Sequence, residues 1–277
     1  MILNNSQKLI AGVLALVLVA GMTSPAFAGV APTHTITVNA ITSPTNNNAP
    51  LFSGTVSPNP VGIGDLLILV SSDIDGVVEG EDALLDGTWN IDTSVSPLSE
   101  GTHSLTFELF GGTANSVVRE ITVDTTAPTI TCPADTTVVL GNPTAPSSTG
   151  SATATDSLDN DPAITFSDVS GANQITRTWG AQDEAGNSAT CDQDITIITL
   201  EQAVNDLIGL GDSHGANTSV LGNVTTLLND DNPNNDKSTC GKLNAFINKV
   251  DADKKLTPEQ KSELIDDANT IKASIGC

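Results

Sequence analysis

The 277-residue sequence predicts a mainly β protein with an α C-terminal domain, built as two tandem β-sandwiches followed by a small helical bundle. Three observations lead to this fold class. Short runs of alternating polar and apolar residues, separated by turn residues, fill the chain from His34 to about Thr199. A segment ending in Ala-Pro at 124–128 interrupts them as an interdomain linker does. After Leu200 the apolar residues take up helical spacing.

Residues 1–28 have the pattern of a cleaved export signal. Lys8 is followed by an apolar stretch from Leu9 to Ala20, and Ala26-Phe27-Ala28 fits the rule of small residues at a cleavage site. The apolar stretch is short for a membrane span. We therefore expect a mature chain that begins near Gly29 and is secreted, extracellular or at the cell surface. An uncleaved membrane anchor is the alternative.

Residues 29–125 form the first predicted sandwich. Its turns are rich in Gly, Pro, Asn and Asp, which favour the backbone conformations of tight turns. Trp89 and Phe107 are expected in its core. The predicted strands begin with the alternating run after His34 and continue with Leu51–Val56, Leu66–Ser71, Thr88–Asp92, His103–Phe110 and Val117–Val123.

Residues 126–199 form the second predicted sandwich. A hairpin loop is expected at Asp183-Glu-Ala-Gly-Asn187, since Gly186 and Asn187 accept the positive φ that such a turn needs. The predicted strands are Thr136–Leu140, Ala152–Thr155, Ile164–Ser167, Gln174–Ala181 and Ser188–Ile198.

Residues 200–277 form the predicted helical domain. Leu243, Phe246 and Ile247 follow the i, i+3, i+4 spacing of a helix with one apolar face. Thr257-Pro258-Glu259-Gln260 has the form of a capping box with proline at the first helical position.

The four cysteines are expected to be paired, because an exported chain matures in an oxidising compartment. Four cysteines allow three pairings. Cys132 and Cys191 bracket a β-rich segment, and Cys240 and Cys277 bracket a helical one. We prefer this sequential pairing because it respects the predicted domain boundaries. Each bond then contributes about 4 kcal/mol in the chain-entropy model.

The second sandwich resembles the hyalin-repeat (HYR) domain. The resemblance rests on the opening Cys132-Pro133, the Asp183-x-x-Gly186-Asn187 turn and the closing Cys191. It implies an immunoglobulin-like sandwich of extracellular proteins, with a link to adhesion.

The preceding segment resembles bacterial Ig-like repeats of surface proteins. The motifs that carry this resemblance are Ser53-Gly-Thr-Val, Asp86-Gly-Thr-Trp-Asn, Glu100-Gly-Thr-His-Ser-Leu and Val123-Asp-Thr-Thr-Ala-Pro. The apolar pattern from Phe246 to Ala268 is similar to a FIMAH-type C-terminal helical module, which accompanies secreted and surface proteins. None of these families implies catalysis.

The charge is strongly negative, with 33 acidic against 10 basic side chains and a net charge of −23. Such a chain repels nucleic acids and anionic membranes. Residues 29–200 carry 21 acidic residues and only Arg119 and Arg177 as bases. Three interpretations remain open: a solvated acidic surface, calcium sites, or a basic partner.

Calcium is the only cofactor that the sequence suggests, because clustered carboxylates on loops supply the oxygen ligands it prefers. None of the clusters has the twelve-residue EF-hand spacing, and solvated turns are the competing interpretation. The candidate ligands are Asp73, Asp75 and Glu79 (with Glu81 and Asp82 beside it), Asp124 at the linker, and Asp156, Asp159 and Asp161.

The sequence does not point to an enzyme. Its histidines are His34, His103 and His214, and the chain has no metalloprotease, nucleophile-elbow or phosphate-loop motif. Asn217-Thr-Ser and Asn223-Val-Thr are candidate N-glycosylation sites of an exported chain.

These observations predict a secreted, non-enzymatic protein for extracellular or cell-surface interaction, meaning adhesion or binding. The expected partner is an extracellular protein or surface polymer, with no nucleic acid and no membrane insertion after signal removal. Two alternatives stay open: a structural envelope or matrix component that binds divalent cations, and an accessory module of a secreted hydrolase.

Overall fold

The structure, a computed structural model, describes residues 34–60, 66–110, 115–228 and 233–277. The predicted signal at 1–28 lies outside the described residues. The chain divides into two compact units. The first contains residues up to 129 together with the segments 154–163 and 181–189, and the second contains residues 130–153, 164–180 and 190–277.

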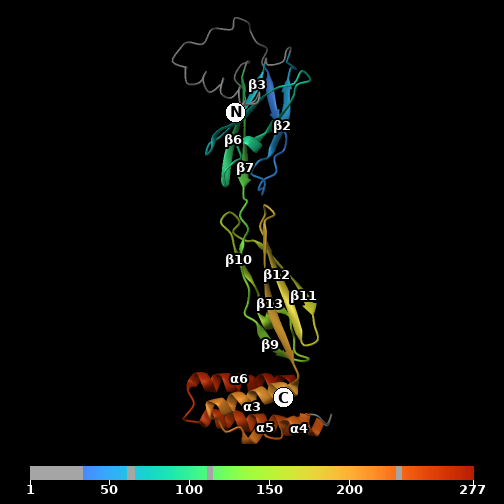
Figure 1. Ribbon diagram of the computed structural model, residues 1–277, viewed down its shortest axis with the longest axis vertical. Helices are drawn as coiled ribbons and strands as arrows, with labels where there is room; N and C mark the ends of the chain where they lie inside the picture. Colours follow the sequence, from blue (N-terminus) through green and yellow to red (C-terminus); the bar gives the residue numbers. More distant parts are fainter. Residues whose placement is uncertain (1–33, 61–65, 111–114, 229–232) are drawn as a thin grey trace, which may run out of the picture. The chain divides into compact units, whose positions relative to one another are not determined.

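The first unit contains an antiparallel β-sandwich (Figure 1). Alternate side chains of its strands point inward, and the rings of Phe52 and Phe107 meet edge to face at 5.4 Å between centroids. Trp89 and Phe107 are buried in this core, as the sequence predicts. One sheet has the order β1(Thr35–Val38)-β2(Leu51–Ser57)-β5(Thr88–Asp92) and is followed by the single turn η1(Thr93–Val95); the other has the order β4(Gly76–Asp82)-β3(Leu67–Ser72)-β6(Gly101–Phe110)-β7(Ser116–Val123).

Strand β4 is an addition to the strands expected from the sequence. Its Gly and acidic residues are poor strand formers, so the local pattern does not indicate it. It forms because the tight turn at Gly76, with φ of 75°, brings Val77–Asp82 back along β3. Glu79 is therefore on a strand at a sheet edge and not on a loop.

The second sandwich combines a four-stranded and a two-stranded sheet. Strands β11, β12 and β13 pair in chain order, whereas β9 runs parallel to β13. The larger sheet has the order β11(Ala163–Ser170)-β12(Gln174–Gln182)-β13(Ser188–Ile198)-β9(Thr136–Val139); the smaller pairs β10(Thr153–Thr155) with β8(Thr129–Thr131), and the one-turn helix α2(Pro146–Thr149) lies between β9 and β10 in the chain.

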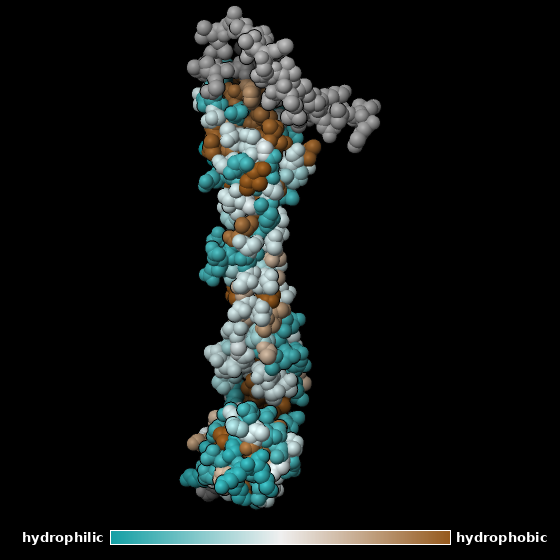
Figure 2. Space-filling view, turned by 90° about the vertical axis from the view of Figure 1, so that its left-hand side faces the viewer, coloured by the Kyte–Doolittle hydropathy of each residue, from teal (hydrophilic) through white to brown (hydrophobic). Residues whose placement is uncertain are grey.

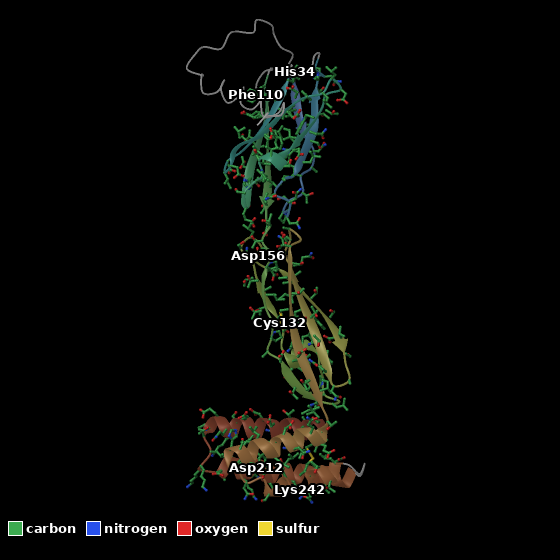
Figure 3. All side chains as sticks on the ribbon, in the orientation of Figure 1. His34, Phe110, Cys132, Asp156, Asp212 and Lys242 are labelled. Carbon is green, nitrogen blue, oxygen red and sulfur yellow. A yellow bond between two sulfur atoms is a disulfide. The ribbon has the colours of Figure 1, made fainter. Side chains whose placement is uncertain are left out.

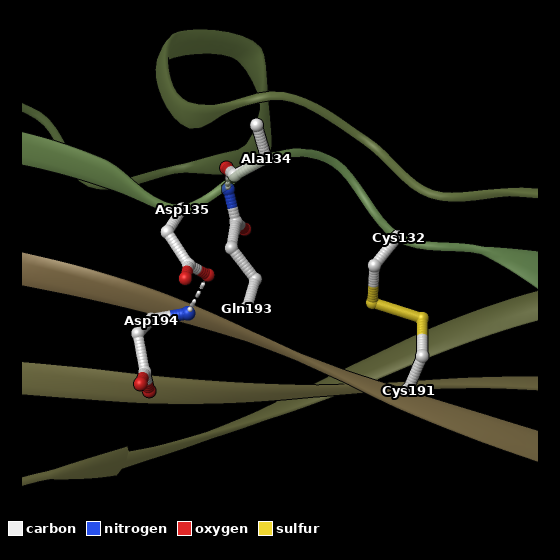
Figure 4. Close-up of a disulfide and its surroundings, with 6 residues drawn as sticks. All are labelled: Cys132, Ala134, Asp135, Cys191, Gln193 and Asp194. Atoms are coloured by element: carbon white, nitrogen blue, oxygen red, sulfur yellow. Dashed lines mark hydrogen bonds between the residues drawn. A yellow bond between two sulfur atoms is a disulfide. The ribbon is translucent and has the colours of Figure 1, made fainter.

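The interior of this sandwich is unusually polar. The Cys132–Cys191 disulfide closes it, in the predicted pairing. Beside the disulfide, the buried Gln193 amide donates to the carbonyl of Ala134, and Asp135 accepts from a main-chain N–H of β13 (Figure 4). A covalent link and a network of buried hydrogen bonds therefore stand where larger domains have apolar packing.

The second unit ends in a helical bundle with an apolar core, and its visible face is largely hydrophilic (Figure 2). Thr257 and Gln260 form the predicted capping box, and Cys240 is bonded to Cys277 as predicted. Among the described residues, no helix is long and apolar enough to cross a bilayer. The helices are α3(Leu200–His214), α4(Val224–Leu228), α5(Pro233–Ala252) and α6(Pro258–Ser274), with the short turn η2(Ser219–Leu221).

Candidate metal centre

Three carboxylates gather in the first unit, at the end of β7. Asp124, Asp156 and Asp183 each offer an oxygen, and these oxygens lie within 4.8 Å of one another. Figure 3 labels Asp156 at this place. Within the described ranges, no other three His, Cys, Asp or Glu residues form such a group.

Asp124 is fixed by the strand that precedes it. Its main-chain N–H donates to the carbonyl of Thr45 at 2.9 Å, which ties the end of β7 to the neighbouring segment. Its side chain is only 2% exposed, and its Oδ1 accepts from the N–H of Thr126 at 3.2 Å. The carboxyl groups of Asp124 and Glu100 are also within hydrogen-bonding reach of each other.

Asp156 lies on the loop after β10. Its Oδ1 accepts from the N–H groups of Leu158 at 2.8 Å and Asp159 at 3.1 Å, the pattern of an Asx turn. This arrangement holds the carboxylate in one rotamer and leaves Oδ2 for a ligand.

Asp183 opens the β12–β13 loop. Both of its oxygens accept from Asn187, one from the main-chain N–H at 2.8 Å and one from Nδ2 at 2.9 Å. Asn187 Nδ2 also donates to the main-chain carbonyl of Asp124 at 2.7 Å. Gly186 has φ of 96°, as the sequence predicts for this turn. The turn motif therefore positions a carboxylate, a role that the sequence did not reveal.

The electrostatics of the group are unfavourable without a cation. Burial raises the pKa of Asp124 to about 6, and the nearby charges of Asp156 and Asp183 act in the same direction, although the hydrogen bond from Thr126 opposes them. None of the ion pairs among described residues includes these carboxylates. Buried like charges without a counter-ion are costly, so the group favours a bound cation.

Glu100 adds a fourth carboxylate to the neighbourhood. Its oxygens accept from the N–H and hydroxyl of Thr125 and from the hydroxyl of Thr126, at 2.8–3.1 Å. Burial alone would raise the pKa of Glu100, but these hydrogen bonds, together with one to the carboxyl of Asp124, outweigh it and lower the pKa. Glu100 therefore stays ionised and holds the two residues that follow Asp124.

The donor set selects the class of metal. All donors are carboxylate oxygens, which suit Ca²⁺ or Mg²⁺ rather than Zn²⁺ or copper. Ca²⁺ takes six to eight oxygens in irregular geometry, whereas Mg²⁺ demands a near-ideal octahedron. A partly buried group from three separate segments fits the more tolerant ion.

The predicted ligands Asp73, Asp75 and Glu79 each accept a hydrogen bond from a main-chain N–H and do not join the group. Asp73 Oδ1 accepts from the N–H of Ser104 at 2.8 Å, and Asp75 Oδ2 from that of Ser99 at 3.0 Å. The buried Glu79 accepts from its neighbour Gly80 at 3.2 Å.

Two more predicted ligands lie beside the centre. Asp159 accepts from the N–H of Asp161 at 2.9 Å and, through its other oxygen, from that of Glu184 at 3.0 Å. Asp159 thus ties the two loops that carry Asp156 and Asp183, and Asp161 is exposed.

Ser72, His103 and Asp75 lie together but do not form a catalytic triad. His103 is fully buried, with Nδ1 2.8 Å from Ser72 Oγ and 3.4 Å from Asp75, and Nε2 bound to the carbonyl of Ser99 at 2.8 Å. Ser72 is buried and accepts two main-chain N–H groups. Ser72 and Asp75 both approach Nδ1 of His103, whereas a triad needs them on opposite ring nitrogens, so the three side chains serve to close the β3–β4 turn.

The two candidate glycosylation residues are both exposed. Asn217 Oδ1 accepts from the N–H and hydroxyl of Ser219, and no described residue accepts from its Nδ2. Asn223 comes directly before α4, whose first residue, Val224, is fully buried.

No family model and no curated protein matches the chain. Among solved structures, it is similar to protocadherin gamma B2 extracellular cadherin domains 3–6, with 14% identity, a TM-score of 0.28, and coverage of 60% of this chain and 50% of that one. It is also similar to the protocadherin gammaB7 EC3-6 cis-dimer, with 12% identity, a TM-score of 0.29, and coverage of 60% and 51%. The chain spans about half the length of the chains it matches.

Proposed function

We propose that this chain is a secreted, non-enzymatic interaction protein of the cell surface or extracellular space, and that its centre at Asp124, Asp156 and Asp183 binds Ca²⁺. The observation that carries the proposal is a buried carboxylate group without a basic partner among the described residues. The two disulfides support an oxidising location. Tandem sandwiches with a polar surface support a binding role rather than a catalytic one.

The bound ion acts on the local structure. It would hold the loops 154–163 and 181–189 against the end of β7, where hydrogen bonds from Asn187 and to Asp159 already align them. At free calcium a hundred times the Kd, binding stabilises the folded state by about 2.7 kcal/mol. We therefore expect adhesion by this protein to require calcium, because the bound ion stiffens the end of β7 and the two loops beside it.

A calcium titration tests the proposal. The measurements are calorimetric binding and the thermal midpoint of the purified chain, first stripped of metal with a chelator. We expect saturable binding and a rise in the midpoint, both lost in Asp156→Asn. Asp161→Asn is the matched control, because it removes a charge from the same loop outside the group. An unchanged midpoint at millimolar calcium refutes the site.

A structural role in an envelope or matrix is the second candidate, favoured by the 33 acidic side chains. Acidic surfaces on neighbouring molecules attract bridging divalent cations. Fractionation of producing cells with and without a chelator separates the two candidates. Release only by the chelator supports the structural role, and protein already free in the medium contradicts it.

A further inference from the structure

Strand β11 is an open edge of the four-stranded sheet in the second sandwich (Figure 1). All eight of its residues are exposed. Ile164, Phe166 and Val169 give this edge an apolar character, and Val169 is 70% exposed. An edge of this kind presents unpaired main-chain N–H and C=O groups to any strand that approaches it.

The other sheet edges are protected. Strands β1 and β9 have four residues each, β8 and β10 have three, and β5, the other edge of the three-stranded sheet, has five and ends in Asp92. Strand β4 carries three acidic residues and a register shift, and β7 carries Arg119 and Glu120 and meets Thr45. Strand β11 has eight residues, its one charged residue, Asp168, is paired with Arg177, and its sequence contains no Pro, Gly or Lys. Short strands, unpaired charges and bulges block pairing, so among the described edge strands β11 is the one best suited to it.

The charge of this edge is balanced, unlike that of the surrounding molecule. The one acidic residue of β11, Asp168, accepts two hydrogen bonds from Arg177, at 2.7 and 2.8 Å. The chain as a whole has a net charge of −23. Another strongly acidic chain is therefore repelled at most surfaces but meets no uncompensated carboxylate on β11.

The apolar anchor of the edge is held in place. The guanidinium of Arg177 lies 4.6 Å from the ring centroid of Phe166, and the Phe166 and Trp179 rings are 5.2 Å apart. Arg177 is itself 1% exposed and donates to Thr149 Oγ1 and to the carbonyl of Thr144. Phe166 is nevertheless 48% exposed. A fixed, half-exposed aromatic ring costs little entropy when it is covered.

We propose that β11 pairs antiparallel with β11 of a second copy of this chain, so that the two four-stranded sheets become continuous. A two-fold interface brings the same surface of each copy together. It covers the Phe166 region of both copies, and the compensated charge of Asp168 lets this edge accept a partner as acidic as a second copy. The proposal is independent of the calcium site.

The test is sedimentation velocity of the purified chain from micromolar to millimolar concentration, with a chelator present so that no cation bridges two molecules. We expect a reversible monomer–dimer equilibrium. Val169→Lys is expected to weaken association at least tenfold, because it places a charge on the pairing edge. Leu140→Lys is the matched control: Leu140 is 69% exposed in the turn after β9 of the same sheet, and association should not change.

Two further readouts keep the outcome clear. Thr165→Lys repeats the disruption at a second exposed position of β11, and the thermal midpoint of each variant verifies folding. Hydrogen exchange of amides in 164–170 is expected to slow as the concentration rises. A wild-type chain that stays monomeric at millimolar concentration overturns the proposal, and so does a Val169→Lys chain that associates as tightly as wild type. Protection that appears on another strand instead also overturns it.

Discussion

Replacing Asp124 with asparagine should have opposite effects with and without calcium. In the metal-free protein the buried carboxylate faces other acids without a counter-ion, and its pKa is raised to about 6 from an ordinary value of 3.8. A difference of about two pH units corresponds to roughly 3 kcal/mol. The neutral amide of Asp124→Asn avoids this penalty and keeps an oxygen to accept from Thr126.

The sign follows from the direction of the pKa shift. The folded state holds the Asp124 proton more tightly than the unfolded state, so no penalty exists below about pH 4, where both states are protonated. As the pH rises from about 4 to 6, the wild-type metal-free protein loses up to roughly 3 kcal/mol through this group. At about pH 8, Asp124→Asn should therefore be more stable than wild type by up to that amount, a thermal midpoint higher by roughly 10 °C.

The assay is thermal or urea unfolding of both proteins in a chelator and in millimolar calcium, across this pH range. We expect Asp124→Asn to be the more stable protein without metal and to gain nothing from calcium. Between pH 4 and 6 its stability curve should be flatter than that of wild type. A metal-free variant less stable than wild type at pH 8 would falsify the electrostatic argument, and a calcium response equal to wild type would remove Asp124 from the ligand set.

Four further variants test the stability of the fold, with urea unfolding as the measurement. Arg177→Met should destabilise the second sandwich by about 3 kcal/mol, because it leaves buried hydrogen-bond acceptors unpaired; an effect below 1 kcal/mol would contradict the central role of this side chain. Replacing Cys132 and Cys191 with alanine should cost about 4 kcal/mol, since their loop spans 59 residues, whereas no loss would mean that the disulfide is redundant. Gly54→Ala should cost at least about 2 kcal/mol, because a Cβ there would clash with a carbonyl and with a buried indole. Gly209→Ala in helix α3 meets open space and should instead stabilise by about 1 kcal/mol, so the same sign for both glycines would refute this reasoning.

The features that could be predicted from the sequence are those with a local cause. Alternation along a strand, the Thr257–Gln260 capping box and the glycine turn at Gly186 each depend on residues a few positions apart, and the structure has all of them. The disulfide pairing followed from the bracketing of single segments. Strand β4 could not be found in this way, because its partner β3 and not its own composition forms it.

The polar interior of the second sandwich also could not be predicted from the local sequence pattern. Gln193 looks like any polar residue of an alternating strand, yet its Nε2 donates to two carbonyls, those of Ala134 and Thr149. Arg177 stands at a core position because Asp168 balances its charge and Phe166 covers its guanidinium. The hydrogen bonds from Arg177 also lower the pKa of Asp168, so this pair loses strength only as the pH falls below the ordinary range of an aspartate.

The metal centre was predictable from the sequence only in part. Asp124 and Asp156 were predictable as candidates because both are carboxylates at chain turns, but the same prediction named five other acidic residues that are not members of the group. Asp183 was not predicted as a ligand, because the hairpin turn at 183–187 was sufficient to explain its place in the sequence. In a chain with 33 acidic residues, the presence of carboxylates carries almost no information about ligands. What distinguishes these three is that their oxygens lie within 4.8 Å of one another and that none of the ion pairs among described residues includes them, and this arrangement arises only when distant segments pack together.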